Sequence, residues 1–399
     1  MMKKVYLDYA ATSPVDPAVF QAMKPYFLKF FGNASEPHSW GVEAKKAVEK
    51  ARSQVAELLN AKAEEIIFTS CATEAINLAH KGLIEALKLS GFKARPHIIT
   101  TLIEHKAVLE ACHHLKQLKL AKITYLSVDK YGLVDLKDIK KAIRPETVLI
   151  SIMLVNNEVG TIEPLEKIGL MLKTVNALRK KQKLQKIYFH TDATQAIQYL
   201  DCNVDKLGVD LLSLTGHKFY APKGIGALFI RQNTLLTRQQ DGGGQENNLR
   251  SGTENVPYIV ALGKACQLVK ENKRKEGKRI AGLKNRLITQ VLKIPQVKLT
   301  GHPDKRVPHI ASFVVLGVEG EAMLLYLNDQ GVAVSSGSAC TSGELKPSHV
   351  LLAMGIKPEI AHGSLRFSLG KDTSKDDIDY LIKIFPPIVK KLRQMAPKL

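Results

Sequence analysis

The feature that most constrains the fold of this chain is an alternation of short apolar runs with longer amphipathic stretches over its first two thirds. The expected strands are rich in β-branched residues, and they are Glu65–Thr69, His97–Thr101, Ile123–Ser127, Val148–Val155, Ile187–Thr191, Leu211–Leu214 and Ala227–Ile230. The helical patterns between them include Ala72–Leu89, Lys106–Leu118 and Leu165–Arg179. Several runs are apolar throughout, which is typical of a sheet covered by helices on both faces. We therefore expect an α/β fold with a largely parallel sheet.

The pattern changes after about Pro257. A long, charged helical stretch is followed there by one strand-like run and two further helical segments, at Tyr258–Leu292, Ser312–Val318, Gly320–Asn328 and Lys375–Met395. This order predicts a second, smaller α+β domain. We expect a large domain over residues 14–257 and a small domain formed by residues 1–13 and 258–399.

The cysteine content and the start of the chain exclude several classes of protein. The cysteines are Cys71, Cys112, Cys202, Cys266 and Cys340, an odd number without a CxxC pair. This argues against a disulfide framework or a structural zinc site. No apolar run approaches the roughly 20 residues that a membrane-spanning helix needs. The first residues lack the apolar segment of a secretory signal, so we expect a cytoplasmic protein without membrane contact.

The chain is strongly basic, with 58 Lys and Arg against 38 Asp and Glu and a formal net charge of +20. Part of the excess lies in two runs, Arg179–Lys186 and Lys270–Arg279. Such charge fits either a nucleic-acid footprint or a solvated surface. No zinc finger or aromatic RNA-binding motif accompanies it, so we do not expect direct nucleic-acid binding.

Two polar residues at strand ends suggest the chemistry. Lys218 follows the Leu211–Leu214 strand, and Asp192 closes an earlier strand. Active sites of open α/β sheets collect at such strand ends. A lysine held there can form a Schiff base, and enzymes that use pyridoxal phosphate (PLP) place a carboxylate against the ring nitrogen. Most lysines are surface residues and most such aspartates are caps, but the two together in this order are more specific.

Further candidates follow other strands. Ala72 and Thr73 begin a helix after a strand, where unpaired N–H groups can bind an anion, although Thr73 also fits an ordinary cap. His105 follows the His97–Thr101 strand and could stack on a pyridine ring, whereas a buried histidine is the commoner finding. Asn157 follows the Val148–Val155 strand, and its amide could reach a ring hydroxyl. Their shared position at strand ends carries more weight than any one of them.

Cys340 is the candidate reactive thiol. It lies in VSSGSACTSGELKPS, where a concentration of Ser, Gly and Thr predicts an exposed, mobile loop. An accessible thiol on such a loop can act as a nucleophile or carry sulfur. Cys112 and Cys266 fall within helical patterns and are expected to be packed. Cys71 adjoins the expected anion-binding turn and is expected near a cofactor without reacting.

With these residues in place, the sequence strongly resembles the cysteine desulfurases of the NifS/IscS type. The resemblance extends from YLDYAATSPVDP near the start to SLRFSLG at Ser364–Gly370. The matching motifs between them include FGN, FTSCATE, EHKAV, NNEVG, HTDATQ, TGHKFYAPKGIGAL, GGGQE, RSGTEN and SSGSACTSG, in the expected order. The SSGSAC segment places the chain in the long-loop subgroup of this family.

The resemblance implies a fold-type I PLP-dependent transferase. It implies a large domain with a mostly parallel seven-stranded sheet flanked by helices, a smaller α+β domain, and a homodimer. It also implies roles for individual residues. Lys218 would be the Schiff-base lysine, Asp192 the partner of the ring nitrogen, and His105 the residue stacked on the ring. The other implied contacts are Asn157 and Gln195 at the ring hydroxyl; Ala72, Thr73, Thr215, His217 and the partner subunit's Thr253 at the phosphate; and Arg366 with Asn33 at the substrate carboxylate.

The implied reaction converts L-cysteine to L-alanine and leaves a persulfide on Cys340. A sulfur-acceptor protein for iron–sulfur cluster assembly or tRNA thiolation would then take the sulfur. No intrinsic metal site is implied, although Cys340 could ligate an iron–sulfur cluster transiently. Another enzyme of the same fold, such as a selenocysteine lyase or an aminotransferase, is the alternative, and Cys340 discriminates against it. A non-catalytic sulfur-relay protein is a second alternative, which the intact Lys218, Asp192 and His105 disfavour.

Overall fold

The computed structural model describes residues 3–336 and 347–395. Its main element is a 7-stranded sheet with the order β2-β8-β7-β6-β5-β3-β4. The strands are β2 (Ile66–Thr69), β3 (His97–Thr101), β4 (Lys122–Leu126), β5 (Thr147–Ser151), β6 (Tyr188–Asp192), β7 (Leu211–Thr215) and β8 (Gly226–Ile230). Strand β8 is antiparallel to both of its neighbours, and the other pairs are parallel. The predicted α/β fold with a mostly parallel sheet is confirmed.

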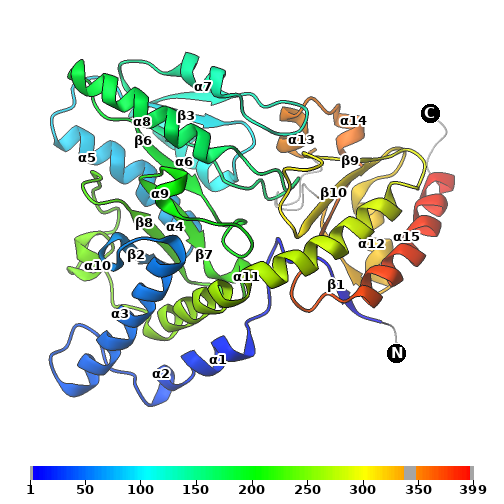
Figure 1. The fold of residues 1–399 in the computed structure, drawn as a ribbon, viewed down its shortest axis with the longest axis horizontal. Coiled ribbons are helices and arrows are strands. Elements are labelled where there is room, and N and C mark those ends of the chain that lie inside the picture. The colour runs from blue at the N-terminus through cyan, green and yellow to red at the C-terminus, as the bar shows by residue number, and fades with distance from the viewer. Residues whose placement is uncertain (1–2, 337–346, 396–399) are drawn as a thin grey trace.

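Helices cover both faces of this sheet, as the apolar strands predict (Figure 1). On one face Ile98 and Leu149 belong to a cluster with side chains of α4 (Ala72–Asn77), α5 (Leu83–Leu89) and α6 (Lys106–Gln117). Their neighbours Ile99 and Ile150 face the other way, toward α3 (Ser39–Leu59), α8 (Leu165–Lys181) and α11 (Val256–Val291). The remaining helices of this part are α1 (Pro17–Met23), α2 (Pro25–Leu28), α7 (Leu136–Ala142), α9 (Val204–Leu207) and α10 (Gln245–Asn248).

The C-terminal part has a smaller sheet of its own. Strands β9 (Val297–Leu299), β10 (Ile310–Val315) and β12 (Ser364–Ser368) pair antiparallel in the order β12-β10-β9. Strand β1 (Val5–Tyr6) pairs in parallel with β11 (Val332–Ala333), so the start of the chain joins this part. Phe313, Phe367 and Phe385 are fully buried here. The helices are α12 (Gly320–Asp329), α13 (His349–Ala353), α14 (Pro358–Ala361) and α15 (Lys375–Met395).

Helix α11 runs across the molecule from α1 and α3 to α15 (Figure 1). It therefore contributes to both the large and the small part of the fold. The predicted division at residues 13/14 and 257/258 stays a prediction.

The expected eight-residue strand Val148–Val155 is wrong in length, because β5 ends at Ser151. Beyond that residue the chain still follows β6, since the N–H groups of Ile152 and Leu154 donate to β6 carbonyls. The N–H of Met153 instead donates to the Glu104 side chain at 3.0 Å. A buried carboxyl thus takes the place of a strand partner on that side, and the regular ladder stops.

Candidate active site

Most of the predicted site residues meet at the carboxyl ends of the parallel strands, around a cavity of about 470 Å³. Asp192 ends β6 and Thr215 ends β7, and these neighbouring parallel strands end at the same edge of the sheet. Residues from the starts of α4 and α6 and from β12 complete the lining. The lining includes Asp8, Ala10, Ala11, Cys71, Ala72, Thr73, His105, Asn157, Asp192, Gln195, Thr215, His217, Lys218, Ser335 and Arg366.

Lys218 lies in a short 3-10 turn, Gly216–Lys218, directly after β7. Its Nζ donates to the carbonyl oxygens of Ala10 at 2.9 Å and Ala11 at 2.6 Å. The segment after β1 therefore forms one wall of the cavity. Ser13 fixes this wall to the lysine turn, because its N–H donates to the carbonyl of His217 at 2.8 Å.

Asp192 and His105 provide an acid and an imidazole in the same cavity. Asp192 is buried, and its Oδ1 accepts the N–H of Thr194 at 2.9 Å, which fixes the carboxylate at the strand end. His105 is the N-cap of α6, where its Nδ1 accepts the N–H of Ala107 at 3.1 Å. Burial lowers the pKa of His105, the charge of Asp192 opposes this, and Lys218 adds to the lowering. A neutral His105 with its proton on Nε2 is the form that satisfies this cap.

One end of the cavity is suited to an anion. Helical structure begins at Ala72 after β2, and Cys71 at the N-cap makes no side-chain cap hydrogen bond. The first N–H groups of α4 and the Thr73 hydroxyl are therefore suited to bind a phosphate. His217 lies at the same cavity and contacts the Thr12 hydroxyl at 3.2 Å through Nδ1. Burial, together with Lys218 and Lys223, lowers the pKa of His217 to about 4, so it serves as a neutral hydrogen-bonding group.

Arg366 lies on β12, lines the cavity and is buried. Its Nη2 pairs with Asp8 Oδ1 at 2.9 Å, and its Nη1 donates to the Asn157 carbonyl at 2.9 Å. Its buried Nε has no hydrogen-bond partner among the described residues. Two of the five N–H donors are used in these contacts, so the guanidinium is held in one orientation while it lines the cavity, which suits a carboxylate ligand.

Cys340 lies outside the described residues, but the described chain on either side of it is anchored at this cavity or next to it. On the N-terminal side, Ser335 lines the cavity and forms a β-bridge with Arg366. On the C-terminal side, the Ser348 hydroxyl donates to Glu158, and His349 Nε2 contacts the carbonyl of Glu104 at 3.0 Å. The segment that contains Cys340 therefore starts beside Arg366 and ends beside the residue that precedes His105.

The packing predicted for Cys112 and Cys266 is confirmed. Cys112, Cys202 and Cys266 are buried, and burial raises the pKa of all three thiols. Thiols of this kind are poor nucleophiles at neutral pH. Cys71 is partly exposed at the cavity, where the Ser70 hydroxyl donates to its sulfur at 3.6 Å.

Comparison with known proteins places this arrangement in a family. The model of the aminotransferase class-V family matches residues 5–381. The chain is 48% identical over 398 residues to cysteine desulfurase IscS of Dictyoglomus turgidum, covering 100% of this chain and 97% of that protein. The chain belongs to the cysteine desulfurase family.

Solved structures agree with this assignment. A NifS-like protein superimposes with a TM-score of 0.88 at 35% identity, covering 98% of this chain and all of that one. The structure of SspA in complex with cysteine has a TM-score of 0.78 at 35% identity, covering 92% of this chain and 99% of that one. The predicted family and the predicted transferase fold are both confirmed.

Two predicted site residues of this desulfurase-family chain do not reach the cavity within one chain. Asn33 is exposed in the turn between α2 and α3, where its Oδ1 accepts the N–H of Ser35. Thr253 is exposed after α10. Their neighbours Ala34 and Glu254 line a common cavity on another side of the molecule. The roles of Asn33 and Thr253 stay predictions.

Residue-by-residue analysis of the sequence missed several polar groups that shape the site. Asp8 is one, and the motif YLDYAAT was its only signal. Glu104 is another, fully buried beneath the site and hydrogen-bonded to Thr101 and Met153. Burial, with Asp192 and Glu163 adding to it, raises the pKa of Glu104 to about 8, so this carboxyl is protonated at neutral pH. In the sequence Glu104 directly precedes His105 in the motif EHKAV, and a role was predicted there only for His105.

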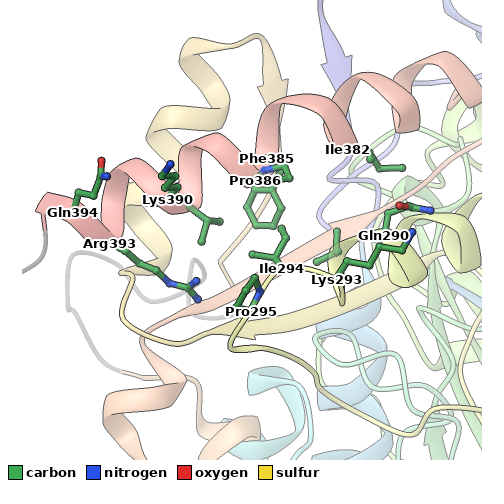
Figure 2. A pocket seen from close by; sticks show the side chains of 12 residues that line it. Gln290, Lys293, Ile294, Pro295, Ile382, Phe385, Pro386, Lys390, Arg393 and Gln394 are labelled. Carbon is green, nitrogen blue, oxygen red and sulfur yellow. The ribbon is translucent and has the colours of Figure 1, made fainter.

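A second cavity, of about 640 Å³, lies between the end of α11 and α15 (Figure 2). Ile294, Pro295, Phe385 and Val389 make its lining largely apolar, and basic side chains stand at its rim. It is larger than the Lys218 cavity but lacks an acid, an imidazole or a thiol among its lining residues. Chemistry therefore assigns the active site to the smaller cavity.

Two other kinds of site are absent from the described parts of the chain. Residues 3–336 and 347–395 contain no cluster of His, Cys, Asp and Glu that could hold a metal ion. Within the same ranges, every helix is too short or too polar to cross a bilayer.

Proposed function

We propose that this protein removes sulfur from L-cysteine with PLP as its cofactor, releasing L-alanine and leaving a persulfide on Cys340. The observation that carries the proposal is the placement of Lys218, Asp192, His105 and Arg366 around one cavity. Of the described residues that flank Cys340, Ser335 lines the same cavity and His349 contacts the carbonyl of the residue that precedes His105. A transaminase would need the first four residues but would have no use for the thiol.

The residues present fit PLP. When bound, this cofactor acts as an electron sink for the bonds around the substrate's α-carbon. Asp192 would hold a proton at the ring nitrogen, and His105 would stack on the ring. The start of α4, Thr73, Thr215 and His217 would hold the phosphate, while Asn157 and Gln195 would face the ring hydroxyl. Lys218 would supply the amine that attaches to the aldehyde and later moves protons at the substrate.

The substrate would be oriented by Arg366, whose fixed guanidinium binds the carboxylate of L-cysteine. The thiolate of Cys340 then attacks the substrate sulfur. A sulfur–sulfur bond forms as the bond between Cβ and sulfur breaks, and the electron pair of the broken bond stays with the substrate. Protons delivered at Cβ and Cα complete alanine, and the sulfur remains on Cys340.

Incubating the purified protein with L-cysteine and a thiol reductant tests this proposal. We expect alanine and sulfide in equal amounts, because each turnover removes one sulfur and reductant releases it from the persulfide. Omitting reductant should limit sulfide but leave the first turnover of alanine intact. Pyruvate in place of alanine, or a requirement for a 2-oxo acid, would show a different reaction of the same fold.

We also propose that the protein is a homodimer. Several large apolar side chains are exposed on α1, α2, the segment after α2 and the start of α3: Phe20, Phe27, Leu28, Phe31 and Trp40. Leu28 is 84% and Phe31 67% exposed. Exposed apolar patches of this kind favour association. The cavity shared by Ala34 and Glu254 ties this region to the loop that carries Thr253, the residue expected to reach a partner's phosphate site.

Light scattering coupled to gel filtration should give twice the chain mass for the wild-type protein. The double variant Leu28→Asp/Phe31→Asp is expected to be monomeric and to bind PLP about five- to thirtyfold more weakly, since the loss of one phosphate contact costs roughly 1–2 kcal/mol. Leu178→Asp, at an exposed leucine on α8, is the matched control and should stay dimeric. A wild-type monomer with full activity would rule out the composite site.

The persulfide would pass to an acceptor protein for iron–sulfur cluster assembly or tRNA thiolation. The identity of that acceptor and a cytoplasmic location stay predictions from the sequence.

A further inference from the structure

We propose that His309 is a positioning residue for Gln195, which it holds so that the amide NH₂ group faces the oxygen on the cofactor ring. This inference rests on the proposed function, because it concerns how the protein binds PLP. The sequence analysis assigned no role to His309, which lies just before β10 in the C-terminal part of the fold.

The geometry links two distant segments through buried atoms. Gln195 follows β6 in the turn after Asp192 and lines the cavity, whereas His309 lies outside the cavity lining. His309 Nε2 is 3.2 Å from Gln195 Oε1, and both side chains are buried. Gln195 Nε2 donates to the carbonyl oxygen of Ala10 at 2.9 Å. That carbonyl also accepts from Lys218 Nζ, so Gln195 and the Schiff-base lysine share one acceptor.

These partners allow only one orientation of the Gln195 amide. An amide oxygen only accepts, and an amide nitrogen only donates. Turning the group over would place Gln195 Oε1 against the Ala10 carbonyl and would set the NH₂ against the N–H of His309. Both contacts would be repulsive and buried, which is costly. The NH₂ therefore stays on the side of Ala10, and its second N–H is left to donate to an acceptor in the cavity.

His309 is itself held in the form that this role requires. Its ring stacks on Tyr199 with centroids 4.8 Å apart, and its carbonyl accepts the N–H of Leu369. Burial lowers the pKa of His309 to about 3, and the facing positive charges of Arg366 and Lys284 add to this, so the ring is neutral. Nδ1 has no hydrogen-bond partner among the described residues. The single proton therefore belongs on Nε2, where it meets Gln195.

A fixed donor at the ring oxygen affects the proton affinity of the linkage between Lys218 and the cofactor. The group that would titrate is the Lys218 nitrogen bound to the cofactor's aldehyde carbon. When this nitrogen loses its proton, its positive charge no longer balances the negative charge on the ring oxygen. A hydrogen bond from Gln195 stabilises the oxygen most in this form and so lowers the pKa of the linkage. If His309 is removed, one of the two contacts that fix the amide is lost, the amide can rotate away from the ring oxygen, and the pKa should rise.

The test is a pH titration of the visible absorbance band of the PLP-loaded protein, which requires no turnover. His309→Phe keeps the ring that stacks on Tyr199 but loses the N–H. We expect it to raise the pKa of the band by about one unit, a tenfold increase in proton affinity. His309→Gln places an amide N–H close to the former Nε2 and should bring the pKa back toward the wild-type value.

Tyr199→Phe is the matched control, because it keeps an aromatic ring stacked on His309. The visible band of this variant should titrate with the wild-type pKa. A His309→Phe variant with an unchanged titration would overturn the inference. If that variant does not fold, His309→Leu compared with His309→Gln gives the same test. A wild-type protein without any visible band after PLP treatment would instead show that the proposed cofactor is wrong.

Discussion

Replacing Lys218 with alanine is expected to abolish covalent attachment of PLP and to lower alanine formation by a factor of roughly 10³ or more. Lys218 is the one lysine among the residues that line the described part of the cavity. Its amine donates to the carbonyl oxygens of Ala10 and Ala11 in the N-terminal wall. Asp192, His105 and the phosphate contacts remain in the variant, so PLP should still bind without a covalent bond.

Borohydride reduction followed by peptide mapping measures this directly. In the wild-type protein the reduced cofactor should be found on the peptide that contains Lys218, and in the variant no peptide should carry it. Lys223→Ala is the matched control, because Lys223 is an exposed lysine in the turn before β8. The Lys223→Ala variant should keep the covalent attachment of the cofactor to Lys218. A reduced cofactor on any other lysine would contradict the assignment.

Replacing Cys340 with alanine is expected to reduce alanine release from L-cysteine to background while leaving the cofactor's absorbance spectrum unchanged. The two tasks are separate, because Lys218, Asp192 and His105 act on the substrate carbon skeleton and need no thiol. Breaking the bond between carbon and sulfur requires a nucleophile that takes the sulfur. Ser335 and His349, on either side of the Cys340 segment, tie it to Arg366 and to the carbonyl of Glu104.

Cys340→Ser should fail as well, since an alcohol is far less easily ionised at neutral pH than a thiol. Cys71→Ser is the informative comparison, because Cys71 is the thiol that the described part of the chain places at the cavity. Alanine release should persist in Cys71→Ser at a rate within a few-fold of the wild-type rate. Near-normal alanine release by Cys340→Ala would show that the thiol is not required.

The sequence predicted those parts of the site that depend on local structure. Lys218 and Asp192 stand at the ends of apolar strands, and neighbouring parallel strands necessarily bring such ends together. The strand lengths were less accurate: the apolar run through Val155 looks continuous, but the Glu104 carboxyl interrupts its ladder after Ser151. Only the folded chain shows that interruption.

The parts that were missed depend on contacts between residues far apart in the chain. Lys218 binds the carbonyl of Ala10 across 208 positions, and alanine carbonyls leave no signature in a sequence. His309 reaches Gln195 across 114 positions, from a segment that the sequence assigns to another domain. Asn33 and Thr253 illustrate the opposite case, because motif resemblance assigned them to a site that they do not reach within one chain.

The most direct test of the central claim is mass spectrometry of the intact, cysteine-treated protein, followed by peptide mapping without reductant. Our account predicts one added sulfur atom on the peptide that contains Cys340, removable by a thiol reductant and absent from Lys218→Ala. Sulfur found on Cys71 instead, or alanine formed with no sulfur on the protein, would contradict it.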